Sequence, residues 1–357
     1  MDKYLKKLNF DFRTNQKVLK LISQIDAYKG KWNIIEAREN IYLKELKRIA
    51  TIESIGSSTR IEGGTLTDQE IEELLNNVEI TKLETRDQQE VIGYYETLEL
   101  IYENYDKIPL SENYIKQLHQ NLLKYSEKDS RHRGKYKTLS NKVVARYPGG
   151  VQKVIFNTTD VYLVESEMNH LITWTNEQFE KAEIHPLMII AIFIYEFLSI
   201  HPFQDGNGRL SRLLTTLLLL KHDYLFVQYV SFENLIEKTK KEYYEALMDG
   251  QKNRNKDNEN ISKWVLYFLD KLNTLTQRLE AKYDLFKSKG GYLNERQKAL
   301  KDYLEKNQPL KISDFAKRFT HVNINTLKKD LQYMKKEQII QSIGKGKGTV
   351  YVINKEK

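Results

Sequence analysis

Apolar side chains recur every three or four positions through most of this chain, and that spacing predicts a mainly α-helical protein. One such pattern runs over residues 32–50 and continues to Gly63 and Gly64, where we expect the helix to end because glycine favours helix termination. The other expected helices cover residues 86–105, 111–124 and 160–179, with one more opening at the capping box Thr67–Glu70. His119, within the second of these, is expected to be a packing residue.

The most apolar segment is Leu187–Ile200, which is too short to cross a bilayer and therefore predicts a buried core helix. The helix should stop before Pro202, because a residue that precedes proline is pushed out of the helical conformation. The next stretch, Asp205–Gly208, is a poor helix former, and from Arg209 onward leucines again fall on one helical face. We therefore expect a core helix, a glycine-rich loop and a second helix whose N-terminus borders that loop.

Residues 201–212 combine side chains that suit phosphate chemistry. A helix N-terminus presents free backbone N–H groups and partial positive charge, and glycines let an anion approach closely. Arg209 and Arg212 are poorly placed for the helix dipole, and bidentate bonds to phosphate would explain their position. Asp205 offers a hard oxygen ligand for Mg²⁺, and His201 can accept a proton near neutral pH. Each feature alone is common in structural roles, but together they indicate a phosphate-binding site with a base.

The same stretch fills every fixed position of the pattern HPFx[DE]GNGRxxR, and it resembles the signature of the Fic family. The resemblance implies a protein adenylyltransferase, an enzyme that moves AMP from ATP to a Tyr, Thr or Ser hydroxyl of a protein, including itself, and releases pyrophosphate. Carried over by position, His201 is the base and Asp205 holds Mg²⁺ between the α- and β-phosphates. The phosphate-binding residues implied in the same way are Gly206, Asn207, Gly208, Arg209 and Arg212.

A second stretch, Ser58–Gly63, fits [ST]xxxE[GN], which resembles the inhibitory helix that precedes the core in one class of Fic proteins. The resemblance implies that Glu62 pairs with Arg212 and that Ser58 bonds near the same loop, so that ATP binds in an unproductive pose. A carboxylate that occupies a guanidinium competes directly with phosphate, which makes this inhibition physically reasonable. In some relatives the same glutamate helps to remove AMP, so a deAMPylase that uses Glu62 is an alternative.

Two short runs of β-forming residues flank Pro148–Gly150 and predict a hairpin. The resemblance implies that residues 142–158 form a flap whose free edge accepts the target protein as an added strand. Many relatives carry arginine where Lys137 stands in the lead-in to this flap. Tyr243 and Tyr244 match the family's helix on the adenine side, although they could equally be core aromatic residues.

The excess of positive over negative charge lies in the C-terminal part of the chain. Residues 294–357 hold 15 Lys and Arg against 7 Asp and Glu, whereas residues 1–293 hold 42 of each, so the net charge of +8 belongs to the tail. The tail shows three helical patterns followed by two short strands, an order that resembles a winged helix-turn-helix domain. Its third helix would enter a DNA groove and Lys345 and Lys347 would meet phosphates. A DNA-binding regulator with a nucleotide-sensing core is therefore a further alternative, as is a tail that contacts only protein.

The chain has no cysteine, which excludes disulfides and thiolate zinc sites, and its first residues lack the apolar stretch of a signal peptide. We expect a cytoplasmic protein without a membrane segment, whose layout resembles bacterial Fic proteins; homo-oligomerisation is left open. The expected fold is a Fic-domain helical bundle with a β-hairpin flap, plus the winged-helix domain. Its parts are a helical segment ending in the inhibitory helix over 1–64, a Fic core over 65–250, a connecting helix over 251–291 and the winged-helix domain over 292–357.

Overall fold

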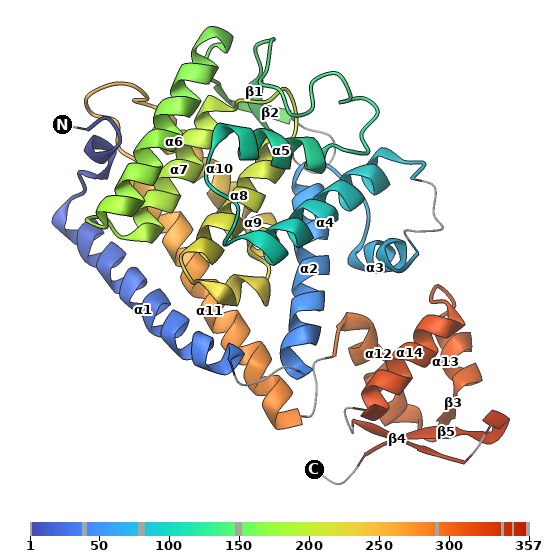
Figure 1. Cartoon of the computed structure of the whole chain (residues 1–357). Helices are drawn as coiled ribbons and strands as arrows, with labels where there is room; N and C mark the ends of the chain where they lie inside the picture. The colour runs from blue at the N-terminus through green and yellow to red at the C-terminus, as the bar shows by residue number, and fades with distance from the viewer. Residues whose placement is uncertain are drawn as a thin grey trace. The chain divides into compact units, whose positions relative to one another are not determined.

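The computed structural model describes residues 2–37, 41–77, 83–146, 152–289, 293–336, 339–344 and 346–354. The chain divides into two compact units, Met1–Thr276 and Gln277–Lys357 (Figure 1). The division falls within helix α11, ahead of the boundary expected near Gly290 and Gly291, which are not among the described residues. Both units are mainly helical, as the sequence predicts. No helix in the described ranges is both long and apolar enough to cross a bilayer.

The first unit is a helical bundle. Its helices are η1 (Leu5–Leu8), α1 (Phe12–Glu36), α2 (Ile41–Ile61), α3 (Asp68–Asn76), α4 (Arg86–Asn104), α5 (Glu112–Leu122), η3 (Val161–Leu163), α6 (Val164–Lys181), α7 (Pro186–Ile200), α8 (Asn207–Lys221), η4 (Leu225–Gln228), α9 (Phe232–Lys238), α10 (Lys240–Gln251) and α11 (Ser262–Lys289). One expectation is wrong: the apolar pattern over residues 32–50 is not one helix, because α1 ends at Glu36 and α2 begins at Ile41.

Helix α7 forms the centre of this unit. Pro186 occupies its first turn, where proline's missing N–H costs nothing, and His185 caps it by accepting a bond from Leu187 N. Residues 187–200 are all buried, with α6 and α8 packed against the helix. From α11, Trp264 Nε1 donates to Ala191 O at 2.7 Å. The expectation of a buried core helix is therefore confirmed.

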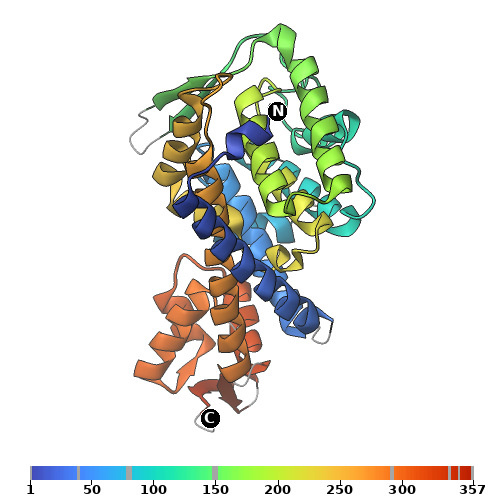
Figure 2. The same cartoon turned by 90° about the vertical axis from the view of Figure 1, so that its left-hand side faces the viewer.

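The predicted hairpin is also confirmed. Strand β1 (Lys142–Arg146) pairs antiparallel with β2 (Gln152–Asn157), and the pairing register shifts between Val143 and Val144. The Pro148–Gly150 turn lies outside the described residues. Both views of the chain place the hairpin at an edge of the first unit (Figures 1 and 2).

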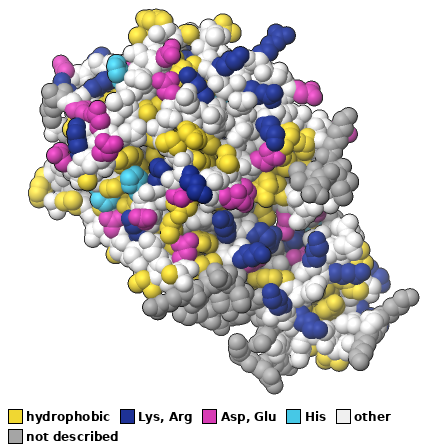
Figure 3. Space-filling model, viewed as in Figure 1, with side chains coloured by type: hydrophobic (Ala, Val, Ile, Leu, Met, Phe, Trp, Pro, Cys, Tyr) yellow, Lys and Arg dark blue, Asp and Glu magenta, His cyan; other side chains and the backbone are white. Residues whose placement is uncertain are grey.

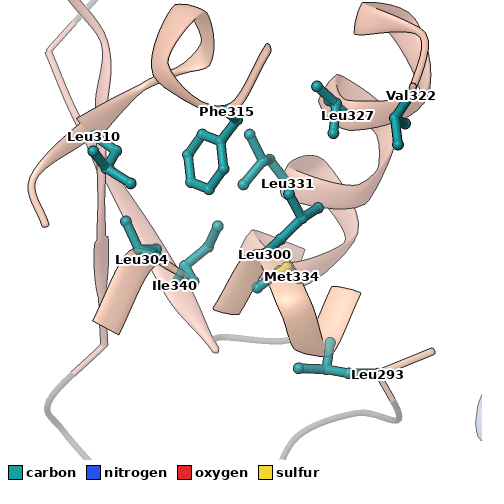
Figure 4. Close-up of a cluster of buried hydrophobic side chains, with 10 residues drawn as sticks. All are labelled: Leu293, Leu300, Leu304, Leu310, Phe315, Val322, Leu327, Leu331, Met334 and Ile340. Atoms are coloured by element: carbon teal, nitrogen blue, oxygen red, sulfur yellow. The ribbon is translucent and has the colours of Figure 1, made fainter. Parts of the chain in front are cut away.

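The second unit contains three helices and a small antiparallel sheet of order β3-β5-β4. The elements are α12 (Glu295–Asn307), β3 (Leu310–Lys311), α13 (Ile312–Arg318), α14 (Ile324–Lys336), β4 (Ile340–Ile343), η5 (Gly346–Gly348) and β5 (Val350–Ile353). The three helices and two of the strands are as expected, and β3 is an additional strand. Helices and sheet share one apolar core around Phe315, which is fully buried (Figure 4). Lys345 is not described, nor is the side chain of Lys347.

Candidate active site

The loop between α7 and α8 is held in one shape by its own side chains. His201 ends α7 in the left-handed conformation, with φ of 53°, and Gly206 precedes α8 with φ of 79°. Asn207 closes the loop, because its Oδ1 accepts from Phe203 N at 2.9 Å and its Nδ2 donates to Phe203 O at 2.7 Å. A fully buried Phe203 ring anchors the loop in the core. These contacts therefore fix the backbone of the glycine-rich segment that leads into the N-terminus of α8.

His201 is oriented as a base. Its Nδ1 lies 3.2 Å from Leu198 O, a carbonyl that can only accept, so Nδ1 carries the proton and Nε2 keeps its lone pair. Burial lowers the pKa of His201 to about 4, with a smaller contribution of the same sign from Lys137. The imidazole is therefore neutral near pH 7 and can take a proton from a substrate.

His119 is a part of the site to which the sequence assigned only packing. Its Nε2 donates to Asp205 O at 3.0 Å, its Nδ1 accepts from Gly134 N at 2.8 Å, and its ring stacks on Phe203 at 3.8 Å. Burial lowers its pKa to about 4, and the bond that Nδ1 accepts from Gly134 N requires the neutral ring. The expectation of a packing residue is correct but incomplete, because His119 also fixes the backbone of the loop.

Asp205 lies at the mouth of the loop among basic side chains. Its Oδ1 accepts from Gly206 N at 2.6 Å, and its carboxylate lies 3.4 Å from Arg209, 3.3 Å from Arg86 and 4.0 Å from Lys128. Burial opposes its ionisation, but Arg209 and the other cations outweigh burial and hold its pKa below the usual range. Asp205 is therefore an ionised, one-third exposed carboxylate in an electropositive setting.

The two arginines of α8 are buried and point to different partners. Arg209 Nη1 lies 2.9 Å from Glu90 on α4, a partner about 120 residues away in sequence. Arg212 is held by α2: its Nε donates to Ser58 Oγ at 2.8 Å, and its Nη2 donates to Ser58 O at 2.9 Å and to Glu62 Oε1 at 3.0 Å. The structure thus brings Ser58, Glu62 and Arg212 together.

Ser58 is in turn supported by a buried chain of hydroxyl and carboxyl groups. Tyr94 on α4 shares a hydrogen bond with the Ser58 side chain, and its hydroxyl donates to Glu233 Oε1 at 3.0 Å. Tyr94 is fully buried and Glu233 is 2% exposed. Because each donor in such a chain polarises the next, Glu233 stabilises the Arg212 guanidinium without touching it. No sequence motif marked this support.

The Glu62 carboxylate sits at the N-terminus of α8. A Cβ built on Gly208 would come far inside van der Waals contact of Glu62 Oε1 and within 3.4 Å of Arg212 Nη1, so only glycine leaves room for the carboxylate. Burial opposes the ionisation of Glu62, but Arg212 and Arg209 outweigh it and hold its pKa below the usual range. The Glu62 carboxylate is therefore an anion bound at a position where a helix N-terminus and buried arginines attract negative charge.

The two tyrosines expected on the adenine side are packed into the core. Tyr243 and Tyr244 are 5% and 7% exposed and meet edge to face. Tyr243 also packs against Trp264, and with Ser211 and Arg212 it lines a small internal cavity. Both residues therefore have a structural role, and their contact with adenine stays a prediction.

Part of this chain is similar in sequence to known proteins. The sequence profile of the Fic/DOC family matches residues 109–219. The protein adenylyltransferase Fic of Aedes aegypti is 44% identical over 57 residues, which cover 16% of this chain and 11% of that protein. The protein adenylyltransferase Fic of Drosophila grimshawi is 27% identical over 187 residues, covering 52% of this chain and 36% of that protein. The chain thus covers well under two thirds of the length of these relatives.

Solved structures show the same fold over more of the chain. A Fic family protein from Desulfovibrio desulfuricans superposes with a TM-score of 0.62 at 21% identity, covering 96% of this chain and 97% of that one. A Fic domain-containing signaling protein from Bacteroides thetaiotaomicron superposes with a TM-score of 0.57 at 22% identity, covering 78% and 99%. At these identities the likeness concerns the fold alone.

Proposed function

Starting from the Fic domain that this chain carries over residues 109–219, we propose that the protein transfers AMP from ATP to a hydroxyl group of a protein and that Glu62 restrains the transfer. The observation that carries the proposal is the Glu62 carboxylate at the N-terminus of α8, bonded to buried Arg212. A site that already holds an anion in this way is suited to phosphate.

His201 performs the proton transfer in this reaction. Its Nε2 takes the proton of a Tyr, Thr or Ser hydroxyl, the hydroxyl oxygen bonds to the α-phosphorus, and the bond from that phosphorus to the bridging oxygen of pyrophosphate breaks. The N–H groups of Gly206, Asn207 and Gly208 face the phosphates, while Arg209 and Arg212 offset their charge. Pyrophosphate leaves and the proton stays on the imidazole until solvent removes it.

Asp205 is the residue that would hold Mg²⁺. No group of three or more acidic or histidine side chains suited to a metal ion occurs in the described part of the chain. Mg²⁺ nevertheless needs only one or two protein carboxylates when phosphates and water complete its shell, and the ionised, partly exposed Asp205 fits that requirement. When bound there, the ion would neutralise charge on the nucleotide phosphates.

The restraint follows from competition for one guanidinium. While Glu62 occupies Arg212 Nη2 and the space beside Gly208, a distal phosphate cannot take the same position. After incubation with α-labelled ATP, we expect strong labelling of protein with Glu62→Gly and weak labelling with wild type. Glu62→Gly/His201→Ala should give no label. Equal label with wild type and Glu62→Gly would refute the restraint, and label that survives the loss of His201 would refute its role as base.

One observation also supports the reverse reaction. The Glu62 side chain is ionised and 36% exposed, so it can accept a hydrogen bond from a water molecule beside the phosphate site. A deAMPylase that uses Glu62 would release AMP from an adenylylated protein, and Glu62→Gly would abolish that release. Glu62→Gly that only increases labelling, with AMP release unchanged, would leave the restraint as the function of Glu62.

The second unit supports a nucleic-acid-binding role. One exposed face of α14 carries Asn325, Lys328, Lys329, Gln332, Lys335 and Lys336. Lys and Arg side chains gather on the side of this unit that Figure 3 shows. We propose that this winged-helix-like unit contacts DNA through α14. We also propose that the protein is cytoplasmic. Binding to a labelled duplex should weaken with salt and survive His201→Ala; if Lys328→Glu/Lys335→Glu leaves the affinity unchanged, α14 is not the contact.

A further inference from the structure

Lys137 lies in the lead-in to the hairpin, and its ammonium group joins three separate segments. The side chain is 3% exposed. Its Nζ donates to Asn141 Oδ1 at 2.9 Å, to Thr158 Oγ1 at 2.7 Å and to Ile200 O at 3.2 Å. Asn141 directly precedes β1, Thr158 directly follows β2, and Ile200 directly precedes His201. One cation therefore connects both ends of the hairpin to the residue before the base.

Backbone contacts place the same lead-in along the catalytic loop. Lys137 N donates to Pro202 O at 2.8 Å, and Tyr136 forms an antiparallel bridge with Phe203. Asn141 Nδ2 donates to Phe203 O at 2.8 Å. Because these contacts continue on both sides of the Lys137 side chain, a shift of the hairpin would be transmitted to the loop.

The charge of Lys137 is not neutralised by a close carboxylate. All three acceptors are neutral, and in the described ranges Lys137 forms no ion pair. Asp160 and Glu167 act on it from a distance, and Glu167 also faces Arg254 at 3.6 Å. Burial lowers the pKa of Lys137 to about 8, which leaves it mostly charged at neutral pH. A buried cation without a close carboxylate therefore bonds to the carbonyl directly before His201.

We infer that Lys137 is a positioning residue for the transfer: its ammonium ties the β1–β2 hairpin to the loop that carries His201 and brings a positive charge to the carbonyl directly before that base. The base role of His201 belongs to the proposed function, and the inference rests on it to that extent. The charged groups that act on His201 are Lys137, which lowers its pKa, and Glu62 and Asp205, which raise it. Lys137 is the positive member of this set, so its loss should favour the protonated imidazole.

The test is an NMR titration of the histidine rings in the full chain, with His201→Gln used to assign the His201 signal. Lys137→Met removes the charge but keeps the length of the side chain, and Lys137→Arg keeps the charge. We expect the pKa of His201 to rise by about one unit in Lys137→Met and to stay within about 0.3 units of wild type in Lys137→Arg. A folded Lys137→Met protein with an unchanged His201 pKa overturns the inference, as does an equal rise in both variants.

Two further variants separate charge from anchoring. Lys137→Gln is neutral and keeps two N–H donors for hydrogen bonds, so it replaces Lys137→Met if that variant does not fold, with the same expected rise in the His201 pKa. Thr158→Val removes one acceptor and keeps the charge, and it should leave the His201 pKa unchanged while raising the KM for the protein target about five-fold in the Glu62→Gly background. A His201 pKa that moves with Thr158→Val contradicts the charge argument. The titration needs no AMP transfer, so its result stands apart from the failure of the proposed function.

Discussion

Gly208→Ala offers a direct measure of how tightly Glu62 is held at the N-terminus of α8. Gly208 is the second residue of α8 and has no positive φ, so its backbone accepts alanine. The new methyl group would instead meet Glu62 Oε1. We therefore expect the cost of the substitution to depend on whether Glu62 is present.

The magnitude follows from the contact that is lost. To make room for the methyl group, the carboxylate must give up its bond to Arg212, and a hydrogen bond to a charged group contributes about 1.5–3 kcal/mol. Solvent reaches a third of the Glu62 side chain and reduces this loss, so the lower half of the range applies. Glycine-to-alanine replacement at a compatible position stabilises by about 0.4–1 kcal/mol. The net destabilisation should be about 1 kcal/mol in wild type and absent in Glu62→Gly.

The assay is a double-mutant cycle from urea denaturation, followed by tryptophan fluorescence. The three tryptophans, Trp32, Trp174 and Trp264, all lie in the first unit, so the signal reports only the unit that contains the site. Wild type, Gly208→Ala, Glu62→Gly and the double variant should give a coupling energy of about 1–2 kcal/mol. A coupling energy below about 0.5 kcal/mol would refute the placement of the carboxylate against Gly208.

Three other outcomes are expected. In the Glu62→Gly background, the pH–rate profile should fall only below about pH 5, because burial lowers the pKa of His201 to about 4 and the base works when neutral; an acid limb near 6.5 contradicts this. Tyr94→Phe in the same background should raise the KM for ATP about five-fold with little change in kcat, since it weakens the support of Arg212; an unchanged KM contradicts that support. Lys7→Met should lower the free energy of unfolding of the first unit, measured in urea, by about 3 kcal/mol, because it leaves the buried Glu259 carboxylate without its cation. Lys6→Met, at an exposed position, should have almost no effect on that free energy.

Local pattern was sufficient for most secondary structure. A mostly apolar run between Pro186 and Pro202 predicts helix α7, and two β-forming runs around glycines predict the hairpin. The error at residues 32–50 has a simple cause: apolar spacing continues in phase from the end of α1 into α2, so periodicity cannot show that the helix stops at Glu36. The strand β3 was not predicted for a related reason, because a strand of two residues is too short to show an alternation of apolar and polar positions.

The loop at residues 201–208 was visible in the sequence because its shape is encoded locally. Gly206 supplies a positive φ, and Asn207 closes hydrogen bonds to a residue only four positions away. Residue types at fixed short spacing are sufficient to identify such a motif. The resemblance to a known family added the prediction that Glu62 pairs with Arg212.

Only the tertiary structure decided which distant groups complete the site. Glu90 reaches Arg209 from α4, His119 holds the loop from α5, and Lys137 bonds the carbonyl before His201. These residues lie tens to more than a hundred positions along the chain from the groups that they contact, and local sequence pattern does not identify such distant partners. The sequence by itself determined the helices, the anion-binding loop and the basic tail, because each depends on neighbours along the chain. Packing decided which buried charges meet, because a charge removed from water needs a partner that chain order does not supply.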